Sequence, residues 1–280
     1  IDKTLNMEPV DLERKITDKT KAIIVVHMLG VPVRLREIKE IADKYDLPII
    51  EDTAWGCGGY YENIPLGTYG DIGTYSFDFA KTMTTGEGGM LVFKDKNLFE
   101  KAAAWHDHGH ENNPDLPRWE DSRSSSGFNY RMNEMQGAVG LAQLKKLDYV
   151  VAEQRKNAHL IQEAIIDLPI EMRSMPDNSF ETADALVFLV NNNQTARRCR
   201  DALLAVGLGT KILPEAITWH FAGTWDHMPE LVERTGRDLI KAFPKSLDLL
   251  NRSVSLPIAI NMIDRFQIKI REALTSVLLS

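Results

Sequence analysis

The sequence predicts an α/β protein with a mixed, mostly parallel sheet flanked by helices and a smaller α+β domain at its C-terminal end. Residues 22–29 form a short apolar run rich in β-branched side chains, typical of a buried strand. Residues 33–46 repeat apolar side chains at the spacing of an amphipathic helix, and residues 47–52 form a second apolar run. Strand, helix and strand joined by short connections make a βαβ unit, which implies a parallel sheet.

Two more strands are expected at residues 73–80 and 89–95, joined by the turn-rich segment KTMTTGEGG. We interpret this segment as a tight turn, because it lacks the Lys-Ser/Thr ending of a P-loop and a strand follows it. No GxGxxG motif follows a strand, which disfavours a dinucleotide-binding domain.

Residues 133–166 contain no proline and predict one long helix, and we place a domain boundary along it, near residue 145. Residues 1–145 are then part of a large domain, and residues 146–280 hold the interdomain helix and a small domain. The chain starts without methionine and enters its first pattern almost at once, so we expect an N-terminal portion of the large domain to be missing. The small domain is expected to contain a strand and two helices, at residues 183–190, 195–207 and 265–279.

The composition is that of a globular protein, with 44% hydrophobic and 26% charged residues. A formal charge of −7 and a pI near 5.6 argue against a nucleic acid or an anionic membrane as partner, since both favour a basic face. No apolar run approaches the roughly 18 residues of a membrane span. Cys57 and Cys199 lie far apart with no CxxC pairing, which predicts structural thiols in a reducing cytoplasm.

Asp52 and Lys81, which lie at the ends of predicted strands, together suit the binding of a carbonyl cofactor. Asp52 ends the second apolar run, at the sheet edge where α/β proteins bind ligands, and Lys81 follows the strand at 73–80. Alone, the first is an ordinary turn aspartate and the second an ordinary solvated lysine. Together they suit a carbonyl cofactor: a desolvated amine attaches it, and a carboxylate keeps a pyridine ring protonated and electron-accepting. Ser76, five residues before Lys81, could contact a phosphate through its hydroxyl.

Three histidines, His106, His108 and His110, form an HxHxH run. It could bind a metal if it lay on one strand face, contact a substrate, or simply form a polar surface loop, as the following Gly, Asn and Pro residues indicate. Trp219 and His220 could equally well pack within the small domain or line a substrate pocket.

Four segments, in their order, resemble the DegT/DnrJ/StrS family of sugar aminotransferases. These belong to the fold-type I, aspartate-aminotransferase-like enzymes that use pyridoxal 5′-phosphate (PLP). The resemblance implies a PLP-dependent transferase fold and a transaminase activity. Its reaction moves an amino group from an amino acid, glutamate by resemblance, to a keto-sugar or keto-sugar acid in polysaccharide, lipopolysaccharide or nucleotide-sugar biosynthesis. The matching segments are TKAIIVVHMLGVP, IIEDTAWGCGG, GDIGTYSFDFAKTMTTGEGGMLVF and FNYRMNEMQGAVGLAQL.

The resemblance also implies a role for each matched residue. Lys81 corresponds to the lysine that carries PLP covalently as a Schiff base, and Asp52 to the aspartate beside the pyridine nitrogen. Ser76 corresponds to a serine on the cofactor phosphate. Asn129 corresponds to an asparagine that reaches the phosphate across a dimer interface, so the implied active unit is a homodimer with shared active sites.

Three departures from the family pattern stand out. Trp55 replaces the usual glutamine or histidine near the cofactor's phenolic oxygen, and an indole can stack and donate but not accept a hydrogen bond. Arg34 stands where an aspartate is common. The family's longer N-terminal part, whose helix start binds the phosphate through backbone N–H groups, is absent from the sequence.

Within the family, the segments HDHGH, AQLKKLD and ITWHFAGTWDHM resemble the branch of 8-amino-3,8-dideoxy-octulosonate transaminases, which makes His108, Trp219 and His220 candidate substrate contacts. Nucleotide-diphosphate-sugar aminotransferases are the alternative branch. A non-catalytic regulator or scaffold that keeps the fold, favoured by Trp55 and Arg34, and a nucleotide-binding α/β domain are the rival functions.

Overall fold

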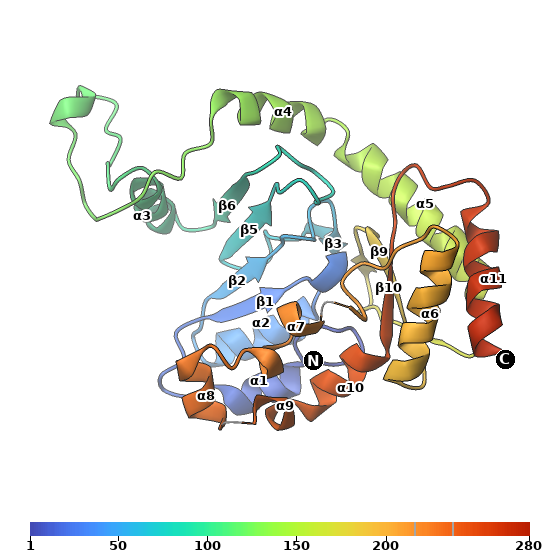
Figure 1. The fold of residues 1–280 in the computed structure, drawn as a ribbon. Helices are drawn as coiled ribbons and strands as arrows, with labels where there is room; N and C mark the ends of the chain where they lie inside the picture. Colours follow the sequence, from blue (N-terminus) through green and yellow to red (C-terminus); the bar gives the residue numbers. More distant parts are fainter. Residues whose placement is uncertain (216, 237) are drawn as a thin grey trace.

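In the computed structural model, four strands form a sheet of order β1-β2-β5-β6 (Figure 1). The first three are parallel and β6 is antiparallel, which confirms the predicted α/β class with a mostly parallel sheet. The structure describes residues 1–215, 217–236 and 238–280, apart from the side chains of Trp219 and His220. The strands are β1 (Ile23–Val26), β2 (Ile49–Asp52), β5 (Ile72–Ser76) and β6 (Gly89–Phe93).

The alternation of side chains along β1 (Ile23–Val26) separates a packed face from an open one. Ile23 and Val25 are buried against Leu35 and Ile38 of helix α2 (Leu35–Lys44). Ile24 and Val26 point the other way and remain exposed. Successive side chains of a strand face opposite sides, so helix packing on one face leaves the other free to border a cavity.

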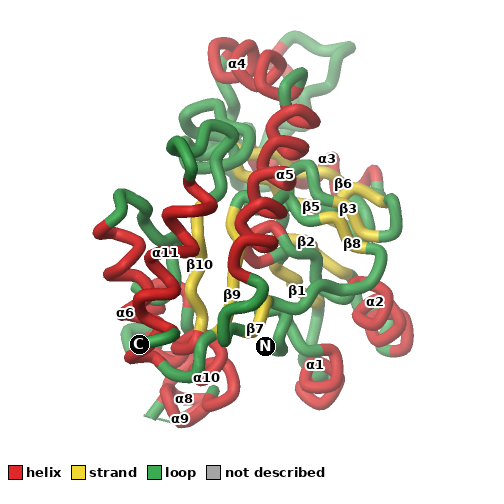
Figure 2. Tube along the Cα trace, turned by 90° about the vertical axis from the view of Figure 1, so that its right-hand side faces the viewer, coloured by secondary structure: helices red, strands yellow, loops and turns green. Residues whose placement is uncertain are grey.

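A second layer is built on an antiparallel sheet of order β10-β9-β7. The central strand β9 (Ala185–Leu189) is buried along its whole length. Helices α5 (Leu147–Ile165), α6 (Asn193–Ala205) and α11 (Phe266–Leu278) pack beside one another over this sheet (Figures 1 and 2). The other two strands are β7 (Glu171–Met172) and β10 (Ser253–Pro257).

The single helix expected over residues 133–166 is wrong: the structure has α4 (Glu134–Leu144) and α5, separated at Lys145 and Lys146. Neither proline nor glycine causes the break. α4 is exposed almost throughout, and its one buried residue, Gly140, packs against Thr85 of the turn before β6. α5 instead buries one face on the second layer. The two segments therefore follow different parts of the fold, which helical periodicity does not reveal.

The segment between α3 (Lys96–His106) and α4 projects from the body of the molecule (Figure 1). Bridges from Asp107 to Asn129 and from His110 to Arg123 close it on itself. We call residues 107–133 the arm.

The remaining elements are short. A three-stranded sheet has the order β4-β3-β8. No helix of the described residues is long and apolar enough to cross a membrane. The bounds are α1 (Pro9–Lys15), β3 (Tyr60–Tyr61), β4 (Ile64–Pro65), β8 (Ser179–Phe180), α7 (Ile217–His220), α8 (Pro229–Thr235), α9 (Leu239–Ala242) and α10 (Pro244–Arg252), with 3₁₀ turns η1 (Met28–Gly30), η2 (Arg118–Glu120) and η3 (Ala222–Thr224).

Candidate active site

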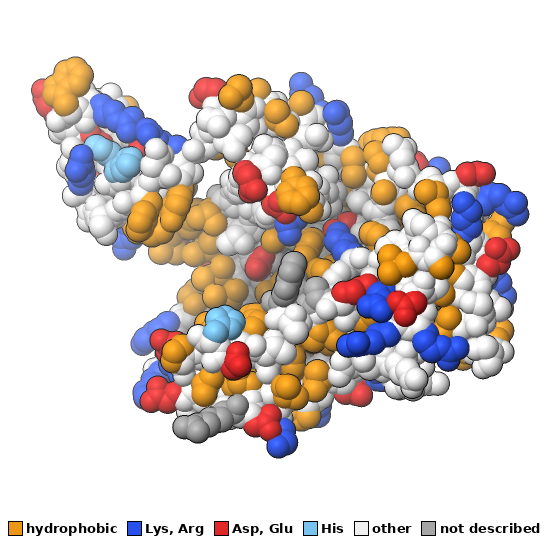
Figure 3. Space-filling view, in the orientation of Figure 1, with side chains coloured by type: hydrophobic (Ala, Val, Ile, Leu, Met, Phe, Trp, Pro, Cys, Tyr) orange, Lys and Arg blue, Asp and Glu red, His pale blue; other side chains and the backbone are white. Residues whose placement is uncertain are grey.

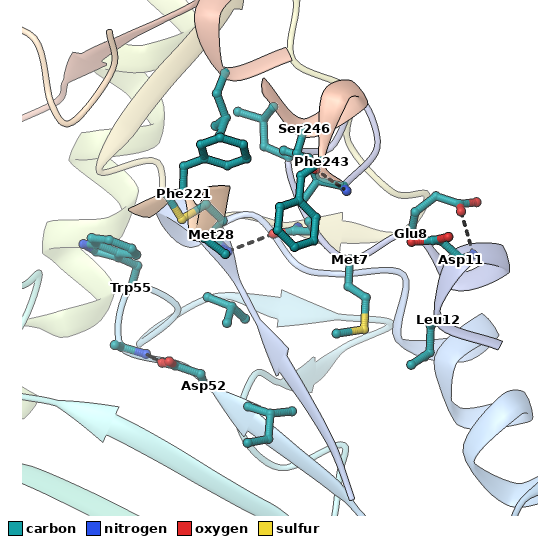
Figure 4. Close-up of a pocket in the computed structure, with 18 of the residues that line it drawn as sticks. Met7, Glu8, Asp11, Leu12, Met28, Asp52, Trp55, Phe221, Phe243 and Ser246 are labelled. Atoms are coloured by element: carbon teal, nitrogen blue, oxygen red, sulfur yellow. Dashed lines mark hydrogen bonds between the residues drawn. The ribbon is translucent and has the colours of Figure 1, made fainter. Parts of the chain in front are cut away.

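A cavity of about 770 Å³ opens at the carboxyl ends of β1 and β2, on the open face of the sheet. Figure 3 shows this hollowed face, with apolar side chains gathered along it. Asp52, Trp55 and Lys81 line the cavity together. In Figure 4, Asp52 lies at the end of its strand and Trp55 on the loop that follows. The structure thus brings three of the sequence-predicted site residues to one place.

Lys81 lies on the loop after β5, with its amine 4.2 Å from the centre of the Trp55 ring. Its backbone N–H donates to the carbonyl of Asp78, at 3.1 Å, in a tight turn. Burial lowers the pKa of the Lys81 amine below its ordinary value of 10.5, because a desolvated ammonium is less stable. Asp78 opposes this effect, and Asp52 does so more weakly. The lowered pKa increases the neutral, proton-accepting fraction of the amine.

Asp52 is the last residue of β2 and is half-buried at the cavity wall. Its Oδ1 accepts a hydrogen bond of 3.1 Å from the Ala54 N–H. Its carbonyl accepts from the His27 N–H, also at 3.1 Å, which ties the ends of β1 and β2 together. The carboxylate is therefore held by its local turn at the edge of the cavity.

The preceding residue, Glu51, is fully buried on the opposite face, where it forms a 3.0 Å hydrogen bond with His27 Nε2. His27 Nδ1 accepts from the Val33 N–H, so the ring proton lies on Nε2 and is donated to Glu51. Backbone N–H groups of Gly67 and Gly70 donate to the same carboxylate, at 2.9 and 2.6 Å. Burial raises the pKa of Glu51, but these hydrogen bonds and the electrostatic attraction of His27 outweigh it, and the pKa is lowered.

Ser76 lies at the carboxyl end of β5, next to β2 in the sheet, so it shares an edge with Asp52. Its Oγ accepts a long bond of 3.4 Å from the Asp78 N–H. Asn129 and His108 lie elsewhere, exposed on the projecting arm. The His108 N–H donates to the carbonyl of Phe128, which keeps His108 beside Asn129. Within one chain, the structure does not bring these two residues to Lys81.

Trp219 and His220 lie on α7, but their side chains are outside the described part of the chain. Neighbouring aromatic residues that the sequence did not single out, Phe221 and Trp225, line the cavity. Their signal was the aromatic-rich segment around residue 220, whose fold could not be read from its periodicity.

The remaining candidate residues lie away from the cavity. Arg34 forms ion pairs with Asp2 and Glu37, at 2.8 and 3.0 Å, and does not line the cavity. His106 ends α3 and His110 lies on the arm; among the described residues no group of three suitable side chains could hold a metal ion. Both cysteines are free thiols.

A lysine and an aspartate that the sequence did not indicate also lie near the site. Lys211 pairs with Asp184 at 2.5 Å, and both act electrostatically on the Lys81 amine. Asp184 lies in the strand expected at residues 183–190 but belongs to no motif, and Lys211 lies outside every expected element. Each is more than a hundred residues from Lys81 in the chain.

Comparison with known proteins identifies the protein family of this chain. The model of the DegT/DnrJ/EryC1/StrS aminotransferase family matches residues 1–275. This chain belongs to that family. It is 36% identical over 200 residues to a GDP-perosamine synthase from Escherichia coli O157:H7, a match covering 71% of this chain and 53% of that protein. The matched regions span about half the length of the curated relatives.

Solved structures share the fold over nearly the whole chain. The sugar aminotransferase CalS13 from Micromonospora echinospora superimposes with a TM-score of 0.82 at 25% identity, covering 99% of this chain and 73% of that one. The PLP-form of a sugar aminotransferase from Streptococcus pneumoniae gives 0.83 at 18% identity, covering 98% and 72%. These matches confirm the predicted aspartate-aminotransferase-like fold.

Proposed function

We propose that the whole protein is a PLP-dependent aminotransferase that moves an amino group from an amino acid, glutamate by family resemblance, to a keto-sugar. The observation that carries the proposal is the meeting of Lys81, Asp52 and Trp55 in one cavity on a family scaffold. The family match supports the reaction class, and the PLP-form of the Streptococcus pneumoniae enzyme supports the cofactor.

The residues present fit the cofactor. PLP, when bound, supplies an electrophilic carbonyl and a pyridine ring that accepts electrons released at the donor's Cα. Lys81 would hold the cofactor covalently through its amine, and its lowered pKa suits that amine to accept the proton of the donor's Cα. Asp52 would keep a proton on the pyridine nitrogen, and the half-buried Trp55 indole would cover the ring.

The phosphate contacts complete the proposal. The Ser76 hydroxyl, at the same sheet edge as Asp52, would donate to the phosphate. Asn129 is exposed on an arm that projects from its own chain. This position suits an asparagine that serves the site of a second copy, and hence a homodimer with shared active sites. His108, which lies beside it, would then approach the substrate of that second copy.

We also propose the domain division near residue 145. The buried residues of the cluster around Phe188 all lie between 158 and 274, and those of the cluster around Val25 lie between 23 and 66. A third cluster, which includes Leu29 and Val187, joins the two parts. Residues 1–145 would belong to the cofactor-binding domain, and residues 146–280 to the interdomain helix and the small domain.

Two classes of acceptor remain to be separated. Similarity to an enzyme named GDP-perosamine synthase favours a keto-sugar carried on a nucleoside diphosphate. The segments HDHGH and ITWHFAGTWDHM favour an eight-carbon keto-sugar acid instead. Amination of each acceptor by the full-length protein, with glutamate as donor and cytoplasmic reducing conditions, distinguishes them.

Trapping of the cofactor tests the function directly. Borohydride reduction of the full-length, PLP-loaded protein followed by peptide mapping should place the cofactor on Lys81, and glutamate added beforehand should prevent trapping. Lys81→Ala should abolish both trapping and transamination. Lys96→Ala is the control, because the Lys96 side chain is 85% exposed on α3. If Lys81→Ala still transaminates, the assignment is wrong.

The second candidate is a regulator or scaffold that keeps the fold without catalysis. Its support is Trp55, whose ring occupies the place of a hydrogen-bonding side chain beside Lys81. Such a protein would trap no PLP on any lysine, so the same mapping experiment separates the two candidates.

A further inference from the structure

A second amine is held by a buried carboxylate, on a segment that contacts the Trp55 loop. Lys211 Nζ lies 2.5 Å from Asp184 Oδ2. The Asp184 side chain is only 4% exposed, whereas that of Lys211 is 20% exposed. The carboxylate is therefore buried, and Lys211 is the more accessible partner of the pair.

The pair leaves hydrogen-bonding capacity unused. A lysine ammonium has three N–H donors, and Asp184 is the one hydrogen-bond partner of the Lys211 amine among the described residues. Asp184 Oδ1 is also buried, and it accepts no hydrogen bond from any residue that the structure describes. A tethered ammonium with free donors can bind a further anion through charge-assisted hydrogen bonds.

Contacts connect this pair to the cofactor-binding residues. Thr182 Oγ1 donates to the carbonyl of Trp55 at 3.1 Å, and the Thr182 N–H donates to the carbonyl of Gly30 at 3.2 Å. The segment that leads to Asp184 is thereby attached to the loop whose indole lies under the Lys81 amine. Consistent with this proximity, Lys211 lowers and Asp184 raises the pKa of Lys81.

We propose that Lys211, held by Asp184, binds a carboxylate of the amino donor beside Lys81. The inference rests on the proposed aminotransferase function and names the residue that recognises the donor. A donor must place its amine at Lys81 while its carboxylate finds a cation nearby, and Lys211 offers that cation on a rigid support. Asp184 fixes the amine in place, so little side-chain entropy is lost on binding.

The test uses the full-length protein and three variants. Lys211→Met removes the charge, Lys211→Arg keeps it, and the double variant Lys211→Met/Asp184→Asn removes both charges so that no buried carboxylate is left unpaired. The readouts are KM and kcat for glutamate, the dissociation constant of PLP, and the dissociation constant of glutarate. Glutarate keeps two carboxylates but has no reactive amine, so calorimetry measures its binding with and without PLP.

Lys211→Met should raise the glutamate KM and the glutarate dissociation constant by about 10- to 100-fold, the range expected for a lost hydrogen bond to a charged group. We expect kcat and PLP affinity to change little, as for loss of binding that is equal in the ground and transition states. Lys211→Arg should restore most of the affinity. The double variant should recover thermal stability but not glutarate binding.

Three results would overturn the inference. Unchanged glutarate binding in Lys211→Met would show that the pair only fastens the loop. If Lys211→Met weakens PLP binding instead of glutarate binding, Lys211 binds the cofactor phosphate. Recovery of glutarate binding in the double variant would show that the effect acts through folding. If the unsubstituted protein traps no PLP, the proposed function fails, and glutarate binding to the cofactor-free variants still decides the role of Lys211.

Discussion

Glu51 and Asp52 are adjacent carboxylates at the end of one strand, and their surroundings differ completely. Glu51 is fully buried and accepts hydrogen bonds from His27, Gly67 and Gly70. Asp52 is half-buried at a cavity and accepts one bond from its own turn. Because side chains alternate along a strand, consecutive residues face opposite sides of the sheet.

The difference shows that one carboxylate stabilises the fold and the other is available to a ligand. Glu51 fastens the loop of residues 66–70 under the sheet, where Gly73 allows close approach: a Cβ there would lie 1.9 Å from the carbonyl oxygen of Gly67. This fastening fixes the strand end that carries Asp52. One carboxylate is saturated with hydrogen bonds, and its neighbour keeps acceptor capacity for a ligand.

The largest effect on stability is expected from Glu51→Ala. The change leaves the His27 Nε2–H and two backbone N–H groups without their acceptor in a buried site, and breaking a buried pair of this kind costs about 3–5 kcal/mol. Urea unfolding measures the loss. The control is Glu100→Ala, an exposed glutamate on α3, where a change within about 0.5 kcal/mol is expected. A Glu51→Ala loss no larger than the control would contradict a supporting role.

Asp52→Asn should change stability little and activity strongly, the opposite of Glu51→Ala. The amide can still accept from the Ala54 N–H, so the free energy of unfolding should stay within about 1 kcal/mol. Transaminase turnover should fall about 10²- to 10³-fold, because a neutral amide stabilises the cationic ring poorly. Unfolding and steady-state rates measured on the same preparations check both statements. Full activity in Asp52→Asn would remove Asp52 from the chemistry.

How far sequence alone reaches is visible in these same residues. The βαβ pattern and the family landmarks predicted the fold and the strand that ends in Asp52, because strands and helices carry periodic signals. The break at Lys145 was missed, since it arises from two packing environments rather than from local propensity. Asp184 and Lys211 were missed because contacts between distant segments leave no mark in the sequence around them.

Acid sensitivity should distinguish the two carboxylates further. The pKa of Glu51 is lowered in the folded state, so the stabilisation by its charge is present above its ordinary value of 4.5 and is lost as the pH falls through the folded pKa. Glu51→Gln should cost about 1–3 kcal/mol at pH 7, since an amide cannot accept all three bonds. It should also flatten the fall in stability below about pH 4.5. Urea midpoints across this range test the sign, and Asp52→Asn provides the comparison.

The smallest effect is expected at Trp55, the residue that departs from the family pattern. An indole face stabilises a nearby ammonium by about 0.5–1 kcal/mol at partly exposed sites. Trp55→Leu should therefore lower the pKa of the Lys81 amine further, while Trp55→Phe should preserve much of the contact. The pH dependence of Lys81 acetylation in the cofactor-free protein, followed by mass mapping, measures this change. Trp119→Leu is the control, because Trp119 is 84% exposed on the arm. A rise in the pKa of Lys81 on removing the ring would show that Trp55 acts mainly by excluding water, which would make desolvation rather than the aromatic face its contribution to the site.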